Sequence, residues 1–269
     1  SLGGLGNFSN VDLEKVLAGK KATIGATISG LSEGLNGSCS PKDLETLLQL
    51  VYLSFTAPRM DDAAFQSFKK RTKASLANQE ADPMTALTDT LQMEMYGNHP
   101  MAGRIKAEMI DQIDYNRIME MYKDRFKEAG DFTFLFVGNI NLEEAKPLIE
   151  TYLGGLPTIN RKENYQDIKM DIRKGAHKNL FTKQMETPKA TVLNIISGNC
   201  EYNLKNDLLM TMLSQTMSMV YLETVREKEG ASYGVSAFGQ LSRGVKDEAI
   251  FQIYFDTDPA KREKMEQIV

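Results

Sequence analysis

The stretch FTFLFVG, residues 132–138, constrains the fold more than any other part of the sequence. It is almost wholly apolar, and a short continuous apolar run of this kind is typical of a strand buried on both faces. A polar turn and the amphipathic pattern NLEEAKPLIETYL follow it, so we expect a helix directly after the strand. The sequence therefore predicts a unit that mixes a sheet with helices.

Helix start signals recur before and after this run. Ser40-Pro41 offers a capping hydroxyl and a proline at the first helical position, and Asp61-Asp62 offers a capping carboxylate. Gly130 is expected to close the helix that begins near residue 113, and residues 36–38 (NGS) are expected to form a turn. The predicted helices are 40–57, 61–79, 82–97, 113–130, 141–153, 206–229 and 258–269, and the predicted strands are 20–30, 132–138, 179–185, 190–198, 232–240 and 248–255.

These elements predict an α+β protein of two related domains, each an antiparallel-rich sheet with helices packed on one face. Residues 156–178 are polar and have no periodicity, as a linker would. We therefore expect domains at 1–155 and 179–269. Both end on the pattern strand, polar turn, helix, which favours related domains over unrelated ones.

Charge and hydropathy exclude several partners. The 36 acidic and 32 basic residues are interspersed and give a net charge of −4, which leaves no basic face for nucleic acid. No apolar run approaches the roughly 20 residues of a membrane span. The sequence has no initiator methionine and stops inside a predicted helix, so we expect a fragment of a longer polypeptide.

The residues that usually bind metals or activate nucleophiles are scarce. His99 and His177 are the two histidines, each without a second ligand at metal-site spacing, and Cys39 and Cys200 form no CxxC pair. Ser218 has no histidine base nearby in sequence, which disfavours serine hydrolysis. We expect no metal site and no bound cofactor, and we interpret both histidines as surface or loop-anchoring residues. The methionines of LLMTMLSQTMSMVYL are core filler or, alternatively, a peptide-binding surface.

The stretch VREKEGASYG places Arg226 at the end of a predicted helix and Tyr233 at the start of a predicted strand. One interpretation is structural, because a cation complements a helix carboxyl end and Gly230 can supply the left-handed cap. The other is that both side chains reach one point beyond the corner. There they would offer a cationic and a neutral donor to a carbonyl oxygen that gains charge, or to a peptide backbone.

Four stretches together carry a resemblance to a known family. The chain resembles the pitrilysin or insulinase zinc peptidases, also called inverzincins, over most of residues 1–260, in SLGGLGNFSNVDLEKVLAGK, GLNGSCSPKDLETLLQLVYLSFTAPRMDDAAF, FTFLFVGNINLEEAKPLIETYLGGLP and YLETVREKEGASYGV. The resemblance implies a clamshell peptidase of two halves, each with two similar α+β domains. It also implies that the amino-terminal half binds zinc through HxxEH, which is absent here.

The chain is therefore similar to the carboxy-terminal, noncatalytic half of a bacterial zinc protease. The domain at 1–155 would be the third of the family and lack its amino-terminal part, and the domain at 179–269 would be the fourth and lack its carboxy-terminal part. The resemblance maps the family's arginine and tyrosine onto Arg226 and Tyr233, as auxiliary catalytic residues that contact the substrate carbonyl or backbone. It implies two partners, the zinc-bearing half and an unfolded peptide, and bacterial relatives imply a periplasmic location. The alternative is a metal-free structural or peptide-binding module with no role in hydrolysis.

Overall fold

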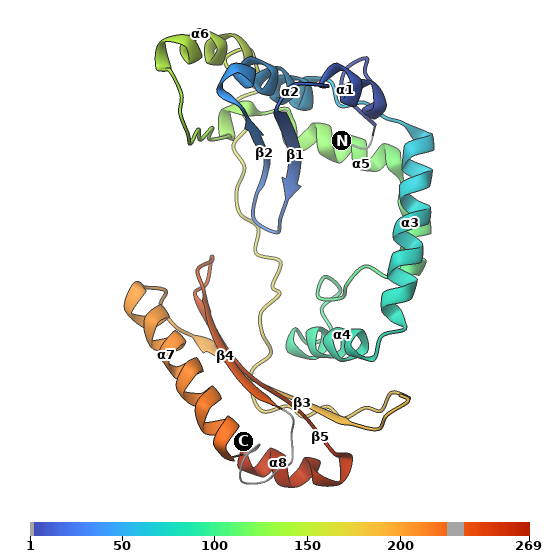
Figure 1. Cartoon of the computed structure of the whole chain (residues 1–269), viewed down its shortest axis with the longest axis vertical. Coiled ribbons are helices and arrows are strands. Elements are labelled where there is room, and N and C mark those ends of the chain that lie inside the picture. The colour runs from blue at the N-terminus through green and yellow to red at the C-terminus, as the bar shows by residue number, and fades with distance from the viewer. Residues whose placement is uncertain (1–2, 225–233) are drawn as a thin grey trace. The chain divides into compact units, whose positions relative to one another are not determined.

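The computed structural model describes residues 3–224 and 234–269, and it confirms a mixed α+β fold in which every described sheet is antiparallel (Figure 1). The chain divides into two compact units. Unit 1 holds residues 1–89 and 99–170, and unit 2 holds residues 90–98 and 171–269. Their assignment as third and fourth domains of a peptidase stays a prediction. None of the described helices is long and apolar enough to cross a membrane.

The sheet of unit 1 is a hairpin of β1 (Ala22–Ile28) and β2 (Glu33–Cys39), paired from Ala22↔Cys39 to Ile28↔Glu33. The chain reverses between Ser29 and Ser32, where the Ser29 backbone N–H donates to the Ser32 carbonyl. The prediction of a turn at residues 36–38 is therefore wrong. These residues lie inside β2, because cross-strand pairing with β1 outweighs the turn preference of Asn-Gly.

Helix α2 (Leu44–Thr56) covers this hairpin and follows the short 3₁₀ turn η1 (Pro41–Asp43). Its apolar side, with Leu47 and Leu50, packs against Leu5, Ala22 and Ile24. The predicted start near Ser40 is confirmed, but the Ser40 hydroxyl donates to the Asp43 carboxylate at 2.5 Å and makes no capping bond to the helix backbone.

A second hydrophobic cluster of unit 1 has Phe55, Phe126 and Leu156 as its buried residues. Phe126 is fully buried at the end of α5, and its ring lies against those of Phe55 and Phe132. Because α5 ends at Phe126, the prediction that Gly130 closes it is wrong; Gly130 lies in the following 3₁₀ turn. The other helical elements before residue 153 are α1 (Asn10–Val16), α3 (Asp62–Glu80), α4 (Pro83–Met95), η2 (Ala107–Gln112), α5 (Tyr115–Phe126), η3 (Ala129–Asp131) and α6 (Leu142–Tyr152).

The predicted strand at residues 132–138 is absent from the structure. The segment forms no regular element, and its apolar side chains include Leu135 and Val137, which are 85% and 88% exposed. The physical reason is that a strand requires a neighbour for its backbone groups, and within the described residues no strand pairs with this segment. Residues 132–138 therefore have the apolar composition of a central strand but are not part of a sheet.

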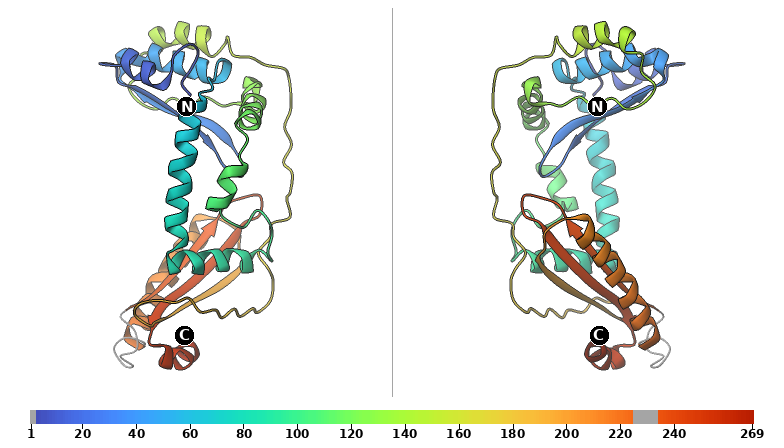
Figure 2. Two further views of the ribbon diagram at one scale, coloured as in Figure 1. Left: turned by 90° about the vertical axis from the view of Figure 1, so that its right-hand side faces the viewer. Right: turned by 90° about the vertical axis from the view of Figure 1, so that its left-hand side faces the viewer.

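Unit 2 is a three-stranded sheet of order β3-β5-β4 with helices α7 and α8 beside it (Figure 2). Its core contains Val192, Phe251, Ile253, Phe255 and Met265. The predicted strand at 179–185 is wrong, since that stretch is exposed and has no strand partner among the described residues. The elements are β3 (Ala190–Asn199), α7 (Leu204–Tyr221), β4 (Val235–Ser242), β5 (Glu248–Thr257), η5 (Pro259–Lys261) and α8 (Arg262–Ile268).

Candidate functional site

The two predicted site residues, Arg226 and Tyr233, lie outside the described residues, as does the predicted end of the preceding helix at 229. What the structure describes is the pair of elements that leads into and out of this corner. Helix α7 ends at Tyr221 and strand β4 begins at Val235. The contacts between α7 and β4 fix the points at which the chain enters and leaves this corner.

Two serines of α7 join the helix to β4. The Ser214 hydroxyl accepts the Gly239 backbone N–H at 2.8 Å and donates to the carbonyl of Met210 within the helix at 2.7 Å. The Ser218 hydroxyl accepts the Ala237 backbone N–H at 3.1 Å and donates to the Ala237 carbonyl at 2.9 Å. Both serines therefore bond to backbone groups of a strand whose other edge pairs with β5.

The spacing of these bonds follows from the geometry of the two elements. Four helical residues, from Ser214 to Ser218, rise by about 6 Å, and two strand residues, from Ala237 to Gly239, rise by about 6.6 Å. Because the two rises nearly agree, one helix face can satisfy alternate N–H groups of the strand edge. The helix thus covers an edge that would otherwise expose unpaired donors. It also fixes α7 and β4 in antiparallel register.

The carboxyl end of α7 is held by a further contact. Tyr221 is 7% exposed, and its hydroxyl donates to the carbonyl of Val269 at 3.2 Å. Burial raises the pKa of this phenol. Met265 of α8 is fully buried in the same core. Both flanks of the corner are therefore anchored in the core of unit 2.

We expect Ser218→Ala to lower the free energy of unfolding by about 1–3 kcal/mol, because it leaves a backbone N–H of β4 without its partner. Ser236→Ala, at an exposed position of the same strand, is the matched control and should have little effect. Urea titration followed by circular dichroism measures both. Equal stability of the two variants would contradict a role for Ser218 in joining α7 to β4.

An apolar groove lies beside α7 in the same unit. It has a volume of about 420 Å³ and is lined by Met210, Leu213 and Met217 of the helix and by Ile196 and Phe251 of the sheet. Residues on the outer side of the helix are also apolar and exposed, among them Leu208, Leu209, Met212 and Met219. The methionine-rich run therefore provides an open apolar surface as well as core contacts.

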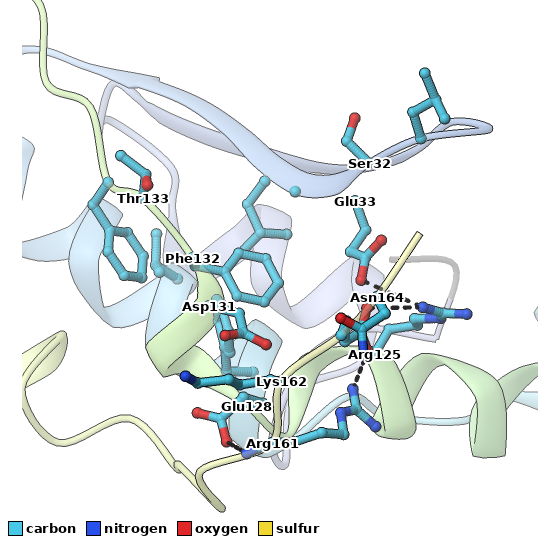
Figure 3. A pocket seen from close by; sticks show the side chains of 17 residues that line it. Ser32, Glu33, Arg125, Glu128, Asp131, Phe132, Thr133, Arg161, Lys162 and Asn164 are labelled. Atoms are coloured by element: carbon cyan, nitrogen blue, oxygen red, sulfur yellow. Dashed lines mark hydrogen bonds and ion pairs between the residues drawn. The ribbon is translucent and has the colours of Figure 1, made fainter. Parts of the chain in front are cut away.

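Unit 1 contains a larger cavity of about 710 Å³ beside β2 (Figure 3). Glu128 is among the residues that line this cavity, and the whole residue is 3% exposed. Its carboxylate accepts four hydrogen bonds. It accepts the Thr158 hydroxyl at 2.5 Å and the backbone N–H groups of Gly130, Ile159 and Arg161 at 2.8 to 2.9 Å. These donors lower the pKa of Glu128 to about 2, and the Thr158 hydroxyl makes the largest contribution. Glu128 thereby ties residues 158–161 to the end of α5.

The pH dependence of stability should reveal this carboxylate. Its pKa in the folded chain is about 2 and its ordinary value is 4.5, so its contribution is complete above pH 4.5 and is lost as the pH falls toward 2. We expect Glu128→Gln to be less stable than the parent above pH 4.5, with the difference shrinking below it. Glu263→Gln, with a side chain 82% exposed, is the control. A stability difference independent of pH would contradict this assignment.

The described residues bring no metal ligands together. No group of three or more His, Cys, Asp or Glu side chains among them is arranged to hold a metal ion. The His99 Nδ1 accepts the Met101 backbone N–H at 3.2 Å, and the His177 Nε2 lies 2.8 Å from the Lys174 carbonyl oxygen. Both histidines thus bond to nearby loop backbone. Cys39 and Cys200 are free thiols.

Comparisons with known proteins place the chain in a family. Residues 112–269, more than half of the chain, match the family model described as the peptidase M16 inactive domain. The chain is 22% identical over 263 residues to a probable zinc protease, PqqL, of Haemophilus influenzae, which covers 97% of this chain and 28% of that protein.

Solved structures show the same fold. The crystal structure of the periplasmic protease PqqL from Escherichia coli superimposes with a TM-score of 0.83 at 18% identity, over 98% of this chain and 29% of that one. A peptidase M16 inactive domain from Pseudomonas fluorescens superimposes with a TM-score of 0.68 at 17% identity, over 99% of this chain and 64% of that one. The chain spans less than a third of the length of the PqqL proteins. It belongs to the peptidase M16 family of pitrilysin-type zinc proteases, as an inactive domain of that family.

Proposed function

We propose that the chain is the noncatalytic, substrate-binding half of a zinc-dependent metalloendopeptidase that cleaves peptides in an enclosed chamber. The match of residues 112–269 to the inactive domain of a peptidase family is the observation that carries this proposal. The sequence holds no HxxEH, so the zinc belongs to the other half, of the same or a partner chain. There it would activate water and polarise the scissile carbonyl.

In this proposal Arg226 and Tyr233 act on the substrate. The phenol hydroxyl of Tyr233 donates a hydrogen bond to the scissile carbonyl oxygen as that oxygen gains negative charge. The guanidinium of Arg226 holds the substrate backbone or carbonyl nearby. The anchored flanks of the corner, α7 and β4, support this role because oriented donors stabilise a transition state best when their supports are rigid.

The apolar groove beside α7 supports a role in binding the peptide. Unfolded peptides present apolar side chains, and the flexible thioethers of Met210 and Met217 can adapt to side chains of different shape. We propose that this groove receives such a side chain, in the same unit as the corner. A groove of this kind gives broad rather than narrow specificity.

The test combines this chain with a purified half that bears HxxEH, and measures cleavage of a fluorogenic peptide. We expect cleavage in the mixture, none by this chain by itself, and no stoichiometric zinc in this chain by metal analysis. Peptide binding without cleavage in the mixture would favour a peptide-binding module instead. Hydrolysis or tight zinc binding by this chain by itself would overturn the proposal.

A further inference from the structure

Gly239 in the middle of β4 leaves room for a side chain of α7. A Cβ added to this glycine would overlap the Sδ of Met210 and would lie 2.8 Å from both the Cγ of Met210 and the Cδ2 of Phe251, closer than side chains in proteins allow. The φ angle of Gly239 is not positive, so the backbone itself does not require glycine. A glycine inside a strand often marks a close approach, and here the Met210 side chain makes it.

The Ser214 hydroxyl fixes this arrangement, because it bonds to both residues. It accepts the Gly239 N–H at 2.8 Å and donates to the Met210 carbonyl at 2.7 Å. The two backbones are therefore held together, and the Met210 side chain has to absorb any change at residue 239. Phe251, which pairs with Gly239 across the sheet, is 9% exposed and belongs to the core. Its ring has less room to move than a thioether on three rotatable bonds.

The Met210 side chain also lines the apolar groove of about 420 Å³ beside α7. It thus lies against Gly239 at one point and borders the open groove at another. A Cβ at residue 239 would displace the thioether toward the open side, where packing does not oppose the movement, and would reduce the volume of the groove. Gly239 therefore sets the depth of the groove without lining it.

The lining of the groove decides which kind of side chain fits. In the part of the chain that the structure describes, its lining contains no charged side chain, so a charged occupant would lose its hydration without gaining a partner. A volume of about 420 Å³ has room for the ring of phenylalanine as well as for leucine, and thioethers make favourable contacts with aromatic rings. The lining residues are Ile196, Ser197, Gly198, Met210, Leu213, Met217, Ala249 and Phe251.

The groove shares helix α7 with the corner that is proposed to act on the substrate (Figure 1). Met217 precedes Tyr221, the last residue of α7, by about 6 Å along the helix axis, and Met210 precedes it by about 16 Å. An extended peptide advances by about 3.3 Å per residue. A peptide that runs along α7 from the corner would therefore present to the groove a side chain roughly two to five residues from the bond to be cleaved.

We propose that Gly239 and Met210 together determine specificity: the Met210 thioether lies on the bare strand backbone, and this keeps the groove deep enough for a large apolar side chain of the substrate, such as phenylalanine or leucine. The inference rests on the proposed function, because the occupant is the peptide that this half of the peptidase binds. It adds the substrate class, peptides with a large apolar residue near the cleaved bond, and the residue that sets the size limit.

NMR of this chain with ¹³C-labelled methionine methyl groups tests the binding step without cleavage. The probes are pentapeptides of glycine and serine whose central residue is phenylalanine, leucine or alanine. The first two should bind about 10-fold or more tightly than the third and should shift the methyl signals of Met210 and Met217. The signals of Met212 and Met219, which are 61% and 64% exposed, should stay unchanged. Equal binding of the three peptides, or shifts confined to Met212 and Met219, would overturn the inference.

Variants at both members of the pair separate groove depth from general damage. Gly239→Ala should lower the preference for phenylalanine over alanine about 10-fold, and adding Met210→Ala to it should restore the preference, because the displaced thioether is gone. Gly25→Ala in β1, where an added Cβ meets nothing within 4 Å, is the matched control and should leave the preference unchanged. The preference is a ratio within one variant, so a smaller folded fraction affects both peptides alike.

Met210→Ala in the parent background provides a second test that holds even if Gly239→Ala does not fold. It deepens the groove from the helix side and should raise the binding of a tryptophan peptide relative to the phenylalanine peptide. An unchanged preference in folded Gly239→Ala would overturn the inference. If that variant does not fold, an unchanged ratio of tryptophan to phenylalanine binding in Met210→Ala would do so.

Cleavage by the mixture with the zinc-bearing half separates this inference from the proposed function. The substrates are fluorogenic peptides that carry phenylalanine or alanine two to five positions from the cleaved bond. Absence of cleavage, together with the expected binding preference, would refute the peptidase role and support the groove assignment. Cleavage with the same phenylalanine-to-alanine ratio of kcat/KM in the parent and in Gly239→Ala would support the peptidase role and refute the inference.

Discussion

A chain that carries Tyr233→Phe, combined with the zinc-bearing half, is expected to cleave peptide about 10- to 1000-fold more slowly than the parent mixture. The substitution removes the phenol hydroxyl and keeps the ring. In the proposed role it therefore withdraws one hydrogen-bond donor from the carbonyl oxygen. Because the lost bond strengthens as charge develops, the loss should fall on turnover and less on KM.

Arg226→Ala should lower turnover in the same range, because it removes the cation that we propose positions the substrate carbonyl or backbone. Lys228→Ala is the matched control. Lys228 lies in the same stretch, VREKEGASYG, and the proposal gives it no contact with the substrate. Its removal should leave the rate unchanged. Rates that stay at the parent level in both Tyr233→Phe and Arg226→Ala would leave only the helix-end role for this pair.

Truncation of the most buried ring of unit 2 should have the largest effect on stability. Phe255 of β5 is fully buried in the core, so Phe255→Ala is expected to lower the free energy of unfolding by about 3–5 kcal/mol. Phe238 lies on the neighbouring strand β4 with 53% of its surface exposed, and Phe238→Ala is the control. Denaturant unfolding followed by circular dichroism should show a large shift for Phe255→Ala and a small one for Phe238→Ala.

The Phe255 variant also links the fold to the site. The same core holds Tyr221 at the end of α7 and Val235 at the start of β4, so its loss should loosen both flanks of the corner. Amide exchange of residues 235–242 should therefore rise in Phe255→Ala and stay unchanged in Phe238→Ala. A Phe255→Ala protein with parent-like stability would contradict the packing described for unit 2.

Several elements could be predicted from local sequence because their causes are local. The Asp61 carboxylate accepts the Ala64 N–H and begins α3 where the sequence predicts a helix. The alternating run of residues 248–255 became β5, and the amphipathic pattern after Asn141 became α6. Capping, alternation and amphipathicity depend on residues within one or two turns of each other, so one sequence is enough to detect them.

Parts of the site could not be predicted, because they depend on contacts between distant residues. Ser214 and Ser218 are spaced like any pair on one helix face, and only the neighbouring strand gives them a function. Glu128 resembles an ordinary glutamate at a helix end until residues 158–161 supply its donors. Arg226 and Tyr233 stay predictions from sequence and resemblance, outside the described residues.

By itself the sequence determined the α+β composition, most helix starts and the family to which the chain belongs, since these depend on local patterns and short motifs. Only the tertiary structure decided that residues 132–138 form no strand here and that two serines of α7 bond to the edge of β4. The physical reason is that a strand is stabilised by its neighbours. An apolar run favours a strand, and whether the strand forms depends on backbone hydrogen-bond partners that are distant in the sequence.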